Sequence, residues 1–369
     1  MKLQLIFIAI VLLTAPLVWA LPRFWHSKLM MAITLIVLGW FAPYSLLTML
    51  LVALIQWWLW MKSEHFKHLR FILSALLPLS ILIVYKMGHR IDNWLIPLGL
   101  SYYAFRQVHV AFEFYKGQLT NITLEEYFQY LLFLPVILIG PIHRINEMNR
   151  SMRRLKWQPS YLSEGLERLL YGMVKINFIG NYLLSFKLIQ YADNIDIPRL
   201  RVYLKLIAFT GNAYIQFSGF SDIAIGLGLI WGIRVMENFN WPFLATNMQE
   251  FWRRWHISLS SWCRDYIFQP IMAFSRNRWL ALVASMLVLA LWHDISWNYI
   301  FWGTFHSMLI LLTIAIRKNL PWLSNFINHH SLGRWVGRIW VFHLFAFSCL
   351  FIMAKNFHDF KSMLNILFT

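Results

Sequence analysis

Charged residues are scarce in this chain of 369 residues. Only 13% of them are Asp, Glu, Lys or Arg, whereas a soluble globular chain carries about 25%. Hydrophobic residues make up 59% of the chain, which is more apolar surface than one soluble core can bury. The composition therefore predicts an integral membrane protein and excludes an ordinary soluble enzyme.

Acidic residues are scarcer than basic ones, with 16 Asp and Glu against 33 Lys and Arg and a net charge of +17. In a membrane protein this excess sets the orientation, because Lys and Arg collect in cytoplasmic loops. Nucleic-acid binding is the other interpretation of a basic chain. The aromatic residues, however, lie inside apolar runs rather than on a basic platform, so we expect no nucleic-acid partner.

The chain has only two cysteines, Cys263 and Cys349, far apart in sequence. They predict neither a disulfide framework nor a zinc site, and we expect no metal. There is no G-x-S-x-G elbow and no P-loop, so covalent serine chemistry and nucleotide hydrolysis have no support. Low-complexity linkers and internal repeats are also missing, which predicts a single domain over residues 1–369.

Long apolar segments fill most of the chain. A membrane-spanning helix needs about 20 mainly apolar residues, and the chain offers roughly nine to eleven such windows. We therefore predict an all-α, polytopic membrane protein, with Ile96–Arg106 as a re-entrant element. The predicted helices and spans are Leu3–Leu21, two spans within Leu29–Met61 divided near Pro43, Phe71–Tyr85, Tyr130–Ile142, Ser163–Lys187, Leu206–Ile233, Trp279–Trp292, Trp297–Ile316 and Ile339–Met353.

The first apolar segment has two interpretations. Val18-Trp19-Ala20 resembles the cleavage site of a signal peptide. The apolar stretch is long for a signal peptide, however, and further spans follow at once. We favour a retained first helix.

Charge, aromatic residues and a histidine are interleaved in residues 250–267. If this stretch is one helix, an apolar stripe faces a polar stripe of Arg253, His256, Ser260 and Arg264. The pattern predicts an amphipathic helix lying along the membrane surface, in which His256 is one more polar residue. The alternative is functional, because arginines pair well with the oxygens of a phosphate-bearing ligand.

Two ionisable residues stand among apolar neighbours. His293 follows the apolar run Leu280–Leu291 and Trp292. Burial would keep its imidazole neutral, so that it could accept a proton as a general base; the other interpretation is a structural histidine bonded between helices. His306 lies too far along to meet it and is expected to pack in the interior or at the interface. Asp222 should face a cavity or a cation, since an isolated carboxylate in lipid is costly.

Several motifs together resemble one family. They are Pro97-Leu-Gly-Leu-Ser101, Gly140-Pro141-Ile142, Phe217-Ser-Gly-Phe-Ser-Asp-Ile-Ala-Ile-Gly-Leu-Gly228, Glu237-Asn-Phe-Asn-Trp-Pro-Phe243, Phe251-Trp-Arg-Arg-Trp-His-Ile-Ser-Leu-Ser260, Arg264-Asp-Tyr266 and Leu291-Trp-His293. On these motifs the chain resembles the membrane-bound O-acyltransferases of the bacterial branch that acts in alginate O-acetylation and in D-alanyl transfer to teichoic acids. The likeness runs from about Pro97 to about Ser307.

The resemblance implies slanted and spanning helices around a central tunnel, with two functional histidines. These fall on His256 and His293, and the resemblance assigns catalysis to His293. Our own hypothesis is that Arg253, Arg254 and Arg264 hold the donor's phosphates, and we predict Asp222 and Trp292 as further substrate-binding residues. The family's usual Trp-His-Gly is here Trp292-His293-Asp294, and Asp294 could orient the imidazole, raise its pKa or cap a helix.

The resemblance also implies the reaction. No bound cofactor is expected; the donor is a cytoplasmic thioester, either acyl-CoA (acetyl-CoA) or an acyl carrier protein. The acceptor is a hydroxyl of an extracytoplasmic polysaccharide, or a periplasmic or extracellular acyltransferase partner. We expect a multi-pass enzyme of the bacterial cytoplasmic membrane that transfers acetyl, an acyl group other than amino-acyl. D-alanyl transfer toward a teichoic-acid-like polymer is one alternative, and a non-enzymatic transporter or scaffold is another.

Overall fold

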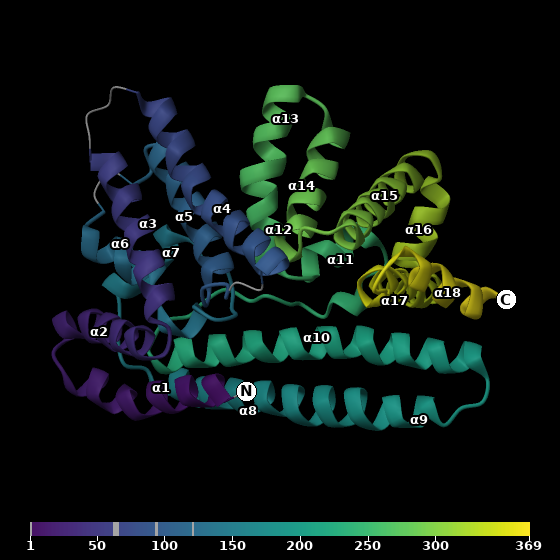
Figure 1. Ribbon diagram of the computed structural model, residues 1–369, viewed down its shortest axis with the longest axis horizontal. Helices are drawn as coiled ribbons and strands as arrows, with labels where there is room; N and C mark the ends of the chain where they lie inside the picture. The colour runs from purple at the N-terminus through teal and green to yellow at the C-terminus, as the bar shows by residue number, and fades with distance from the viewer. Residues whose placement is uncertain (1, 62–65, 93–94, 120–121) are drawn as a thin grey trace. The chain divides into compact units, whose positions relative to one another are not determined.

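The computed structural model describes residues 2–61, 66–92, 95–119 and 122–369, and over these residues the chain forms helices and loops only (Figure 1). The predicted all-α class is confirmed. Contacts between residues group the chain into two compact units, and each is described here by itself. The first unit holds residues 1–171 and 221–236, and the second holds residues 172–220 and 237–369. The single domain and the central tunnel stay predictions.

The first unit begins with apolar helices. The break near Pro43 is confirmed, since one helix ends at Phe41 and the next begins at Pro43, where a proline is tolerated in the first turn. The helices of this unit are α1 (Lys2–Ala20), α2 (Arg23–Phe41), α3 (Pro43–Met61), α4 (Lys67–Asp92), α5 (Leu100–Tyr115), α6 (Leu124–Leu131), the 3₁₀ turn η1 (Leu134–Val136), α7 (Ile145–Arg153) and most of α8 (Pro159–Met173).

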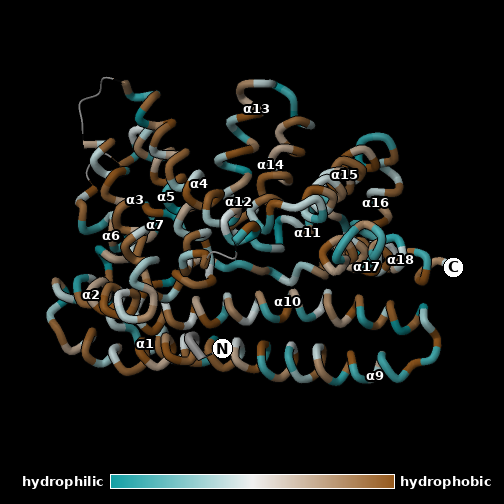
Figure 2. The backbone as a smooth tube through the Cα atoms, in the orientation of Figure 1, coloured by the Kyte–Doolittle hydropathy of each residue, from teal (hydrophilic) through white to brown (hydrophobic). Residues whose placement is uncertain are grey.

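Six helices within the described residues are long and apolar enough to cross a membrane, namely α2, α3 and α4 together with the later helices α10, α15 and α17. Two shorter apolar helices, Leu5–Ala20 and Arg278–His293, add to them. Figure 2 shows mostly hydrophobic residues along α3 and α4. The other apolar windows of the sequence form shorter or irregular segments.

The predicted span Tyr130–Ile142 is wrong. Helix α6 ends at Leu131, a single 3₁₀ turn follows, and the chain then runs without regular structure. Pro135 and Pro141 each lack the N–H donor that a continuous helix needs. Most of this irregular segment is nevertheless buried, so its carbonyl groups need partners within the protein.

Arg106 supplies two of these partners. Its side chain is only 1% exposed, and its guanidinium donates to the carbonyl of Leu131 at 2.9 Å and to the carbonyl of Val136. The arginine belongs to α5, which is buried along most of its length. The predicted re-entrant stretch is therefore a buried helix, entered through Gly99 in the left-handed conformation (φ 74°). A side chain there would meet the Ile137 carbonyl.

The second unit holds most of α10 (Pro198–Ile230), which is the longest helix of the described residues. The predicted helix Ser163–Lys187 is formed by α8 and the π-helix η2 (Val174–Leu188), and α9 (Ile189–Asp193) extends it. In the second unit η2 and α9 run beside α10 (Figure 1). The last residues of α10 belong to the first unit. Gly180 faces the side chains of Asn212 and Gln216 on α10 so closely that a Cβ would lie 2.6 Å from the Gln216 amide nitrogen. Small residues allow this approach.

The rest of the second unit consists of η3 (Pro242–Leu244), α11 (Met248–Arg254), α12 (Ile257–Cys263), the π-helical turn η4 (Arg264–Phe268), α13 (Gln269–Ser275), α14 (Arg278–His293), α15 (Trp297–Asn319), α16 (Pro321–His329), α17 (Ser331–Met353) and α18 (Phe357–Phe368). Helix α15 packs against α14, α16 and α17. Gly303 allows the closest approach, since a Cβ there would lie 2.7 Å from the Cβ of Ala290 on α14.

Replacing Arg106 by Met should lower stability by about 2–5 kcal/mol, because two buried carbonyls lose their donors. Thermal unfolding in detergent measures the loss. Arg150→Met is the matched control, since Arg150 is exposed on α7 and its loss should cost less than about 0.5 kcal/mol. Equal effects of the two substitutions would contradict the role given to Arg106.

Candidate functional site

The helix predicted for residues 250–267 is broken. Helix α11 ends at Arg254, and α12 begins at Ile257. Between them His256 has φ 43° and ψ 54°, a left-handed conformation that costs about 1–2 kcal/mol for a residue other than glycine. The predicted amphipathic surface helix is therefore wrong as a single element. Its apolar stripe is real, because Phe251, Trp255, Leu259, Trp262 and Tyr266 are all buried.

Residues 238–240 hold this break in place. The Asn240 N–H donates to the Arg254 carbonyl at 2.9 Å, and the Ile257 N–H donates to the Asn238 carbonyl at 2.9 Å. The Asn238 side-chain oxygen accepts the Ser258 hydroxyl at 2.7 Å. Asn238 is fully buried, so this pairing is screened little by solvent. These contacts offset the strain at His256 and fix the direction of its side chain.

The His256 ring is buried rather than exposed on a polar face. It lies perpendicular to the Phe217 ring with centroids 4.6 Å apart. Burial, and to a smaller extent the nearby His293, lowers the pKa of His256 well below its ordinary value. Its Nε2 has no hydrogen-bond partner among the described residues. A neutral imidazole with a free ring nitrogen can bind or orient a polar group.

His293 is the last residue of α14, and its side chain is exposed. Its predicted burial is wrong: Leu289 and Ala290, one turn earlier on the same face of α14, are buried. The buried part of that face does not extend to His293, the last residue of the helix. Its ring stacks on Tyr299, with centroids 5.5 Å apart and planes 16° apart. Asp294 follows in extended conformation as the C-cap. A negative charge at the C-terminal end of a helix interacts unfavourably with the helix dipole. Capping of α14 alone therefore does not explain an aspartate at position 294.

The ring of Trp292 lies near the rings of both His256 and His293. Its ring centroid lies 5.9 Å from that of His256 and 4.5 Å from that of His293. Phe217 on α10, the break at His256 and the end of α14 thus place two imidazoles near one indole. One imidazole is buried and the other is accessible, which suits different roles.

Trp302 on α15 is a neighbour that sequence reasoning missed. Its ring lies 5.9 Å from His293 and 4.5 Å from His306. His306 is buried as expected, and its Nε2 lies 2.9 Å from the Ser348 hydroxyl oxygen. Since that hydroxyl donates to the Phe345 carbonyl at 2.7 Å, the His306 Nε2 carries the proton. No motif in the sequence indicated Trp302.

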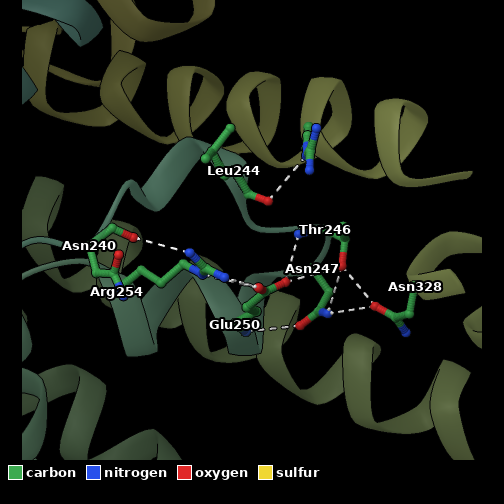
Figure 3. A network of polar contacts seen from close by, with 8 residues as sticks. Asn240, Leu244, Thr246, Asn247, Glu250, Arg254 and Asn328 are labelled. Atoms are coloured by element: carbon green, nitrogen blue, oxygen red, sulfur yellow. Dashed lines mark hydrogen bonds and ion pairs between the residues drawn. The ribbon is translucent and has the colours of Figure 1, made fainter. Parts of the chain in front are cut away.

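The predicted binding arginines differ in their surroundings. Arg254 is bonded to Glu250 at 2.7 Å and 3.0 Å and to the Asn240 carbonyl at 3.3 Å (Figure 3). Burial alone would raise the pKa of Glu250, but the Thr246 N–H and the Arg254 guanidinium outweigh it and hold that pKa below its ordinary value. Arg254 thus has a structural partner. Arg264 is exposed and bonds the neighbouring Asp265 at 2.8 Å.

Arg253 and Arg264 line one cavity of about 270 Å³, which we call the α14 cavity. A third arginine, Arg278 at the start of α14, joins them. The opposite wall is apolar and consists of Trp252, Leu282, Met286, Leu289, Ile310 and Ile314. Leu289 lies one helical turn before His293, about 6 Å along the axis. The lining thus combines three arginines with apolar residues that reach to within one helical turn of His293.

Asp222 belongs to the first unit. Its carboxylate is buried and accepts from the Arg168 guanidinium at 2.6 Å. The expectation that it faces a cation is therefore confirmed. This pair accounts for the buried charge without a substrate, and a binding role for Asp222 stays a prediction.

Comparison with protein families bears on this site. The model of the membrane-bound O-acyltransferase family matches residues 24–354. The chain belongs to the membrane-bound O-acyltransferase family. Both candidate histidines lie inside the matched region.

Individual relatives are also similar. A probable alginate O-acetylase of Azotobacter vinelandii is 33% identical over 234 residues, which are 62% of this chain and 46% of that protein. A teichoic acid D-alanyltransferase of Streptococcus thermophilus is 28% identical over 330 residues, or 80% of this chain and 78% of that protein. A peptidoglycan O-acetyltransferase of Helicobacter pylori is 25% identical over 303 residues. This chain spans about half the length of the alginate O-acetylases that it matches.

Asn238→Ala should destabilise this family member by about 1–3 kcal/mol, because Ser258 loses its buried acceptor. In a double-mutant cycle with Ser258→Ala, measured by thermal unfolding in detergent, we expect a coupling energy of about 1 kcal/mol. Strictly additive effects would show that the Asn238–Ser258 bond does not hold the break.

Proposed function

We propose that this chain is a membrane O-acyltransferase that transfers an acyl group from a thioester to a hydroxyl. Acetyl is the acyl group that we favour. The observation that carries the proposal is the pairing of an accessible imidazole at His293 with a buried one at His256 across Trp292. Family membership and the α14 cavity support the same reaction.

The proposed chemistry needs one general base. The His293 imidazole takes the proton of the acceptor hydroxyl as that oxygen attacks the thioester carbonyl carbon. A carbon–oxygen bond forms and the carbon–sulfur bond breaks, and the imidazolium returns its proton to the leaving thiolate. His256 orients a substrate through its Nε2, and the stacked Tyr299 keeps the His293 ring in place.

The α14 cavity is proposed as the binding site for the donor's arm. Arg253, Arg264 and Arg278 would pair with the phosphates of acetyl-CoA or of a carrier protein's prosthetic arm. The apolar wall from Leu282 to Leu289 would guide the thioester toward His293. The cavity volume suits an arm, whereas the rest of a coenzyme or carrier would stay outside.

The acceptor belongs on the other side of the membrane in this proposal. About 30 Å of hydrocarbon separates a cytoplasmic donor from an extracytoplasmic polysaccharide. A passage through the protein lets the acyl group cross while both bulky partners stay in place. The relatives named for alginate, peptidoglycan and teichoic acid support a cell-envelope polymer, or a partner enzyme that hands the group on, at the bacterial cytoplasmic membrane.

D-alanyl transfer is the second candidate. One observation favours it, since the teichoic acid D-alanyltransferase of Streptococcus thermophilus matches over 78% of its own length, more than the alginate O-acetylase of Azotobacter vinelandii does at 46%. Acetyl-CoA and a D-alanyl carrier protein, offered in turn to the purified protein with a polysaccharide acceptor, separate the two. If the protein turns over neither donor, that result would favour a transporter or a scaffold.

Replacing His293 by Ala should reduce acyl transfer at least about a thousandfold, because the proposed general base is removed. Thioester-dependent acylation of a hydroxyl acceptor by protein in proteoliposomes measures it. His329→Ala is the control, since His329 is exposed on α16 and should leave the rate within about twofold. Wild-type activity in the His293 variant would reject the assignment.

Arg278→Gln should raise the KM for the donor about tenfold and leave kcat within about twofold, because a charge-assisted phosphate contact of roughly 1.5–3 kcal/mol is lost. Steady-state kinetics at varied donor concentration test this. Arg276→Gln is the control, because Arg276 is exposed nearby and does not line the α14 cavity. An unchanged KM in Arg278→Gln would place the donor elsewhere.

A further inference from the structure

A second, larger cavity lies in the second unit, and it shares Gln249 and Arg253 with the lining of the α14 cavity. Its volume is about 820 Å³, and we call it the α15–α17 cavity. Its walls come from the last turns of α15, from α16, from the first half of α17, and from residues 244–254. Drug-sized ligands occupy cavities of roughly 300–1,000 Å³, so the space is large enough for a ligand.

Arginine dominates the charge of this cavity. Its described lining includes five arginines, Arg253, Arg254, Arg317, Arg334 and Arg338, against one carboxylate, Glu250. Glu250 is already bonded to Arg254. The remaining arginines therefore leave an uncompensated positive charge.

Three of these arginines gather where α15 ends and α17 begins. Arg317 is exposed in the last turn of α15. Arg334 donates to the His329 carbonyl at 3.2 Å, and Arg338 donates to the Leu244 carbonyl at 3.3 Å. Carbonyl groups hold these side chains in position without neutralising them. Because each guanidinium has five N–H donors, most donors remain available for an anion.

The wall beyond the arginines is apolar. It is formed by Leu309, Leu312, Ile316, Leu323, Ile327, Val336, Trp340, Val341 and Leu344. Along α17, Leu344 lies ten residues past Arg334, which is about 15 Å at the helical rise. That depth is about half of the roughly 30 Å hydrocarbon core of a bilayer. A ligand that fits both ends has an anionic head and an apolar chain about one leaflet long.

The polar wall of the cavity is a rigid, bonded structure. Thr246 donates its N–H to Glu250 at 2.9 Å and its hydroxyl to Asn328 at 2.7 Å (Figure 3). Gly337 lets α17 lie directly against this segment, since a Cβ there would be 2.7 Å from the Thr246 carbonyl oxygen. The arginines on α17 are thereby held at a fixed place beside the network.

We propose that the α15–α17 cavity binds an anionic phospholipid. The phosphate pairs with Arg317, Arg334 and Arg338, and one acyl chain lies along the apolar wall of α15 and α17. Lys and Arg concentrate at cytoplasmic membrane ends, so the lipid belongs to the cytoplasmic leaflet. Arg317, Arg334 and Arg338 do not line the α14 cavity, and the proposal does not rest on the proposed acyl transfer.

The test is lipid retention by the purified protein, measured by native mass spectrometry with phosphatidylglycerol and phosphatidylcholine supplied in equal amounts. We expect the wild-type protein to retain phosphatidylglycerol over phosphatidylcholine, and the variant R317Q/R334Q/R338Q to lose that preference at least tenfold. The matched control is R199Q/K318Q/K361Q, which removes the same charge at exposed positions outside the cavity. This control should keep the preference.

Three results would overturn the proposal. They are equal retention of both lipids by the wild-type protein, equal loss in the test and control variants, and displacement of phosphatidylglycerol by coenzyme A, which would make the cavity a donor site. If the triple variant does not fold, cross-linking of a photoactivatable phosphatidylglycerol to the wild-type protein tests the proposal instead. Cross-links to the cavity lining of α15 and α17 support the proposal, and cross-links confined to other helices contradict it.

Discussion

The backbone break at His256 is the constraint on which the site depends. A left-handed residue other than glycine persists only where its surroundings compensate the strain, and here Asn238 and Asn240 do so through bonds to both sides of the break. The same bonds turn α12 away from the direction of α11. As a result the His256 ring points into the protein and contacts Phe217 and Trp292.

This arrangement separates two chemically similar side chains. His256 is enclosed by aromatic rings and stays neutral, whereas His293 ends a helix and is accessible. The indole of Trp292 lies near both imidazoles. A site of this kind can give one imidazole a binding role and leave the other to exchange protons. Arg253, Arg264 and Arg278 around the α14 cavity add the charge that a phosphate-bearing donor needs.

The sequence predicted the helical class and most helix positions, because long apolar runs between basic residues admit few other structures. It failed at Tyr130–Ile142, where the buried donor that compensates the prolines is Arg106, 25 residues or more away from the carbonyls that it bonds. It failed again at His256, since Phe251 to Tyr266 keeps helical periodicity through the break. Both failures arise because long-range hydrogen bonds override a local pattern. The resemblance singled out His256 and His293, whose rings both lie near Trp292, and their functional roles stay predictions. Trp302 and Arg278 had no recognisable signal.

Chemical reactivity of the histidines tests the central claim most directly. Diethyl pyrocarbonate modifies accessible neutral imidazoles, and peptide mass spectrometry reads each position. The account predicts that His293 is modified in the folded protein while His256 and His306 are not, and that a thioester donor protects His293. Modification of His256 as fast as His293, or a His293 that reacts equally with and without donor, would contradict it.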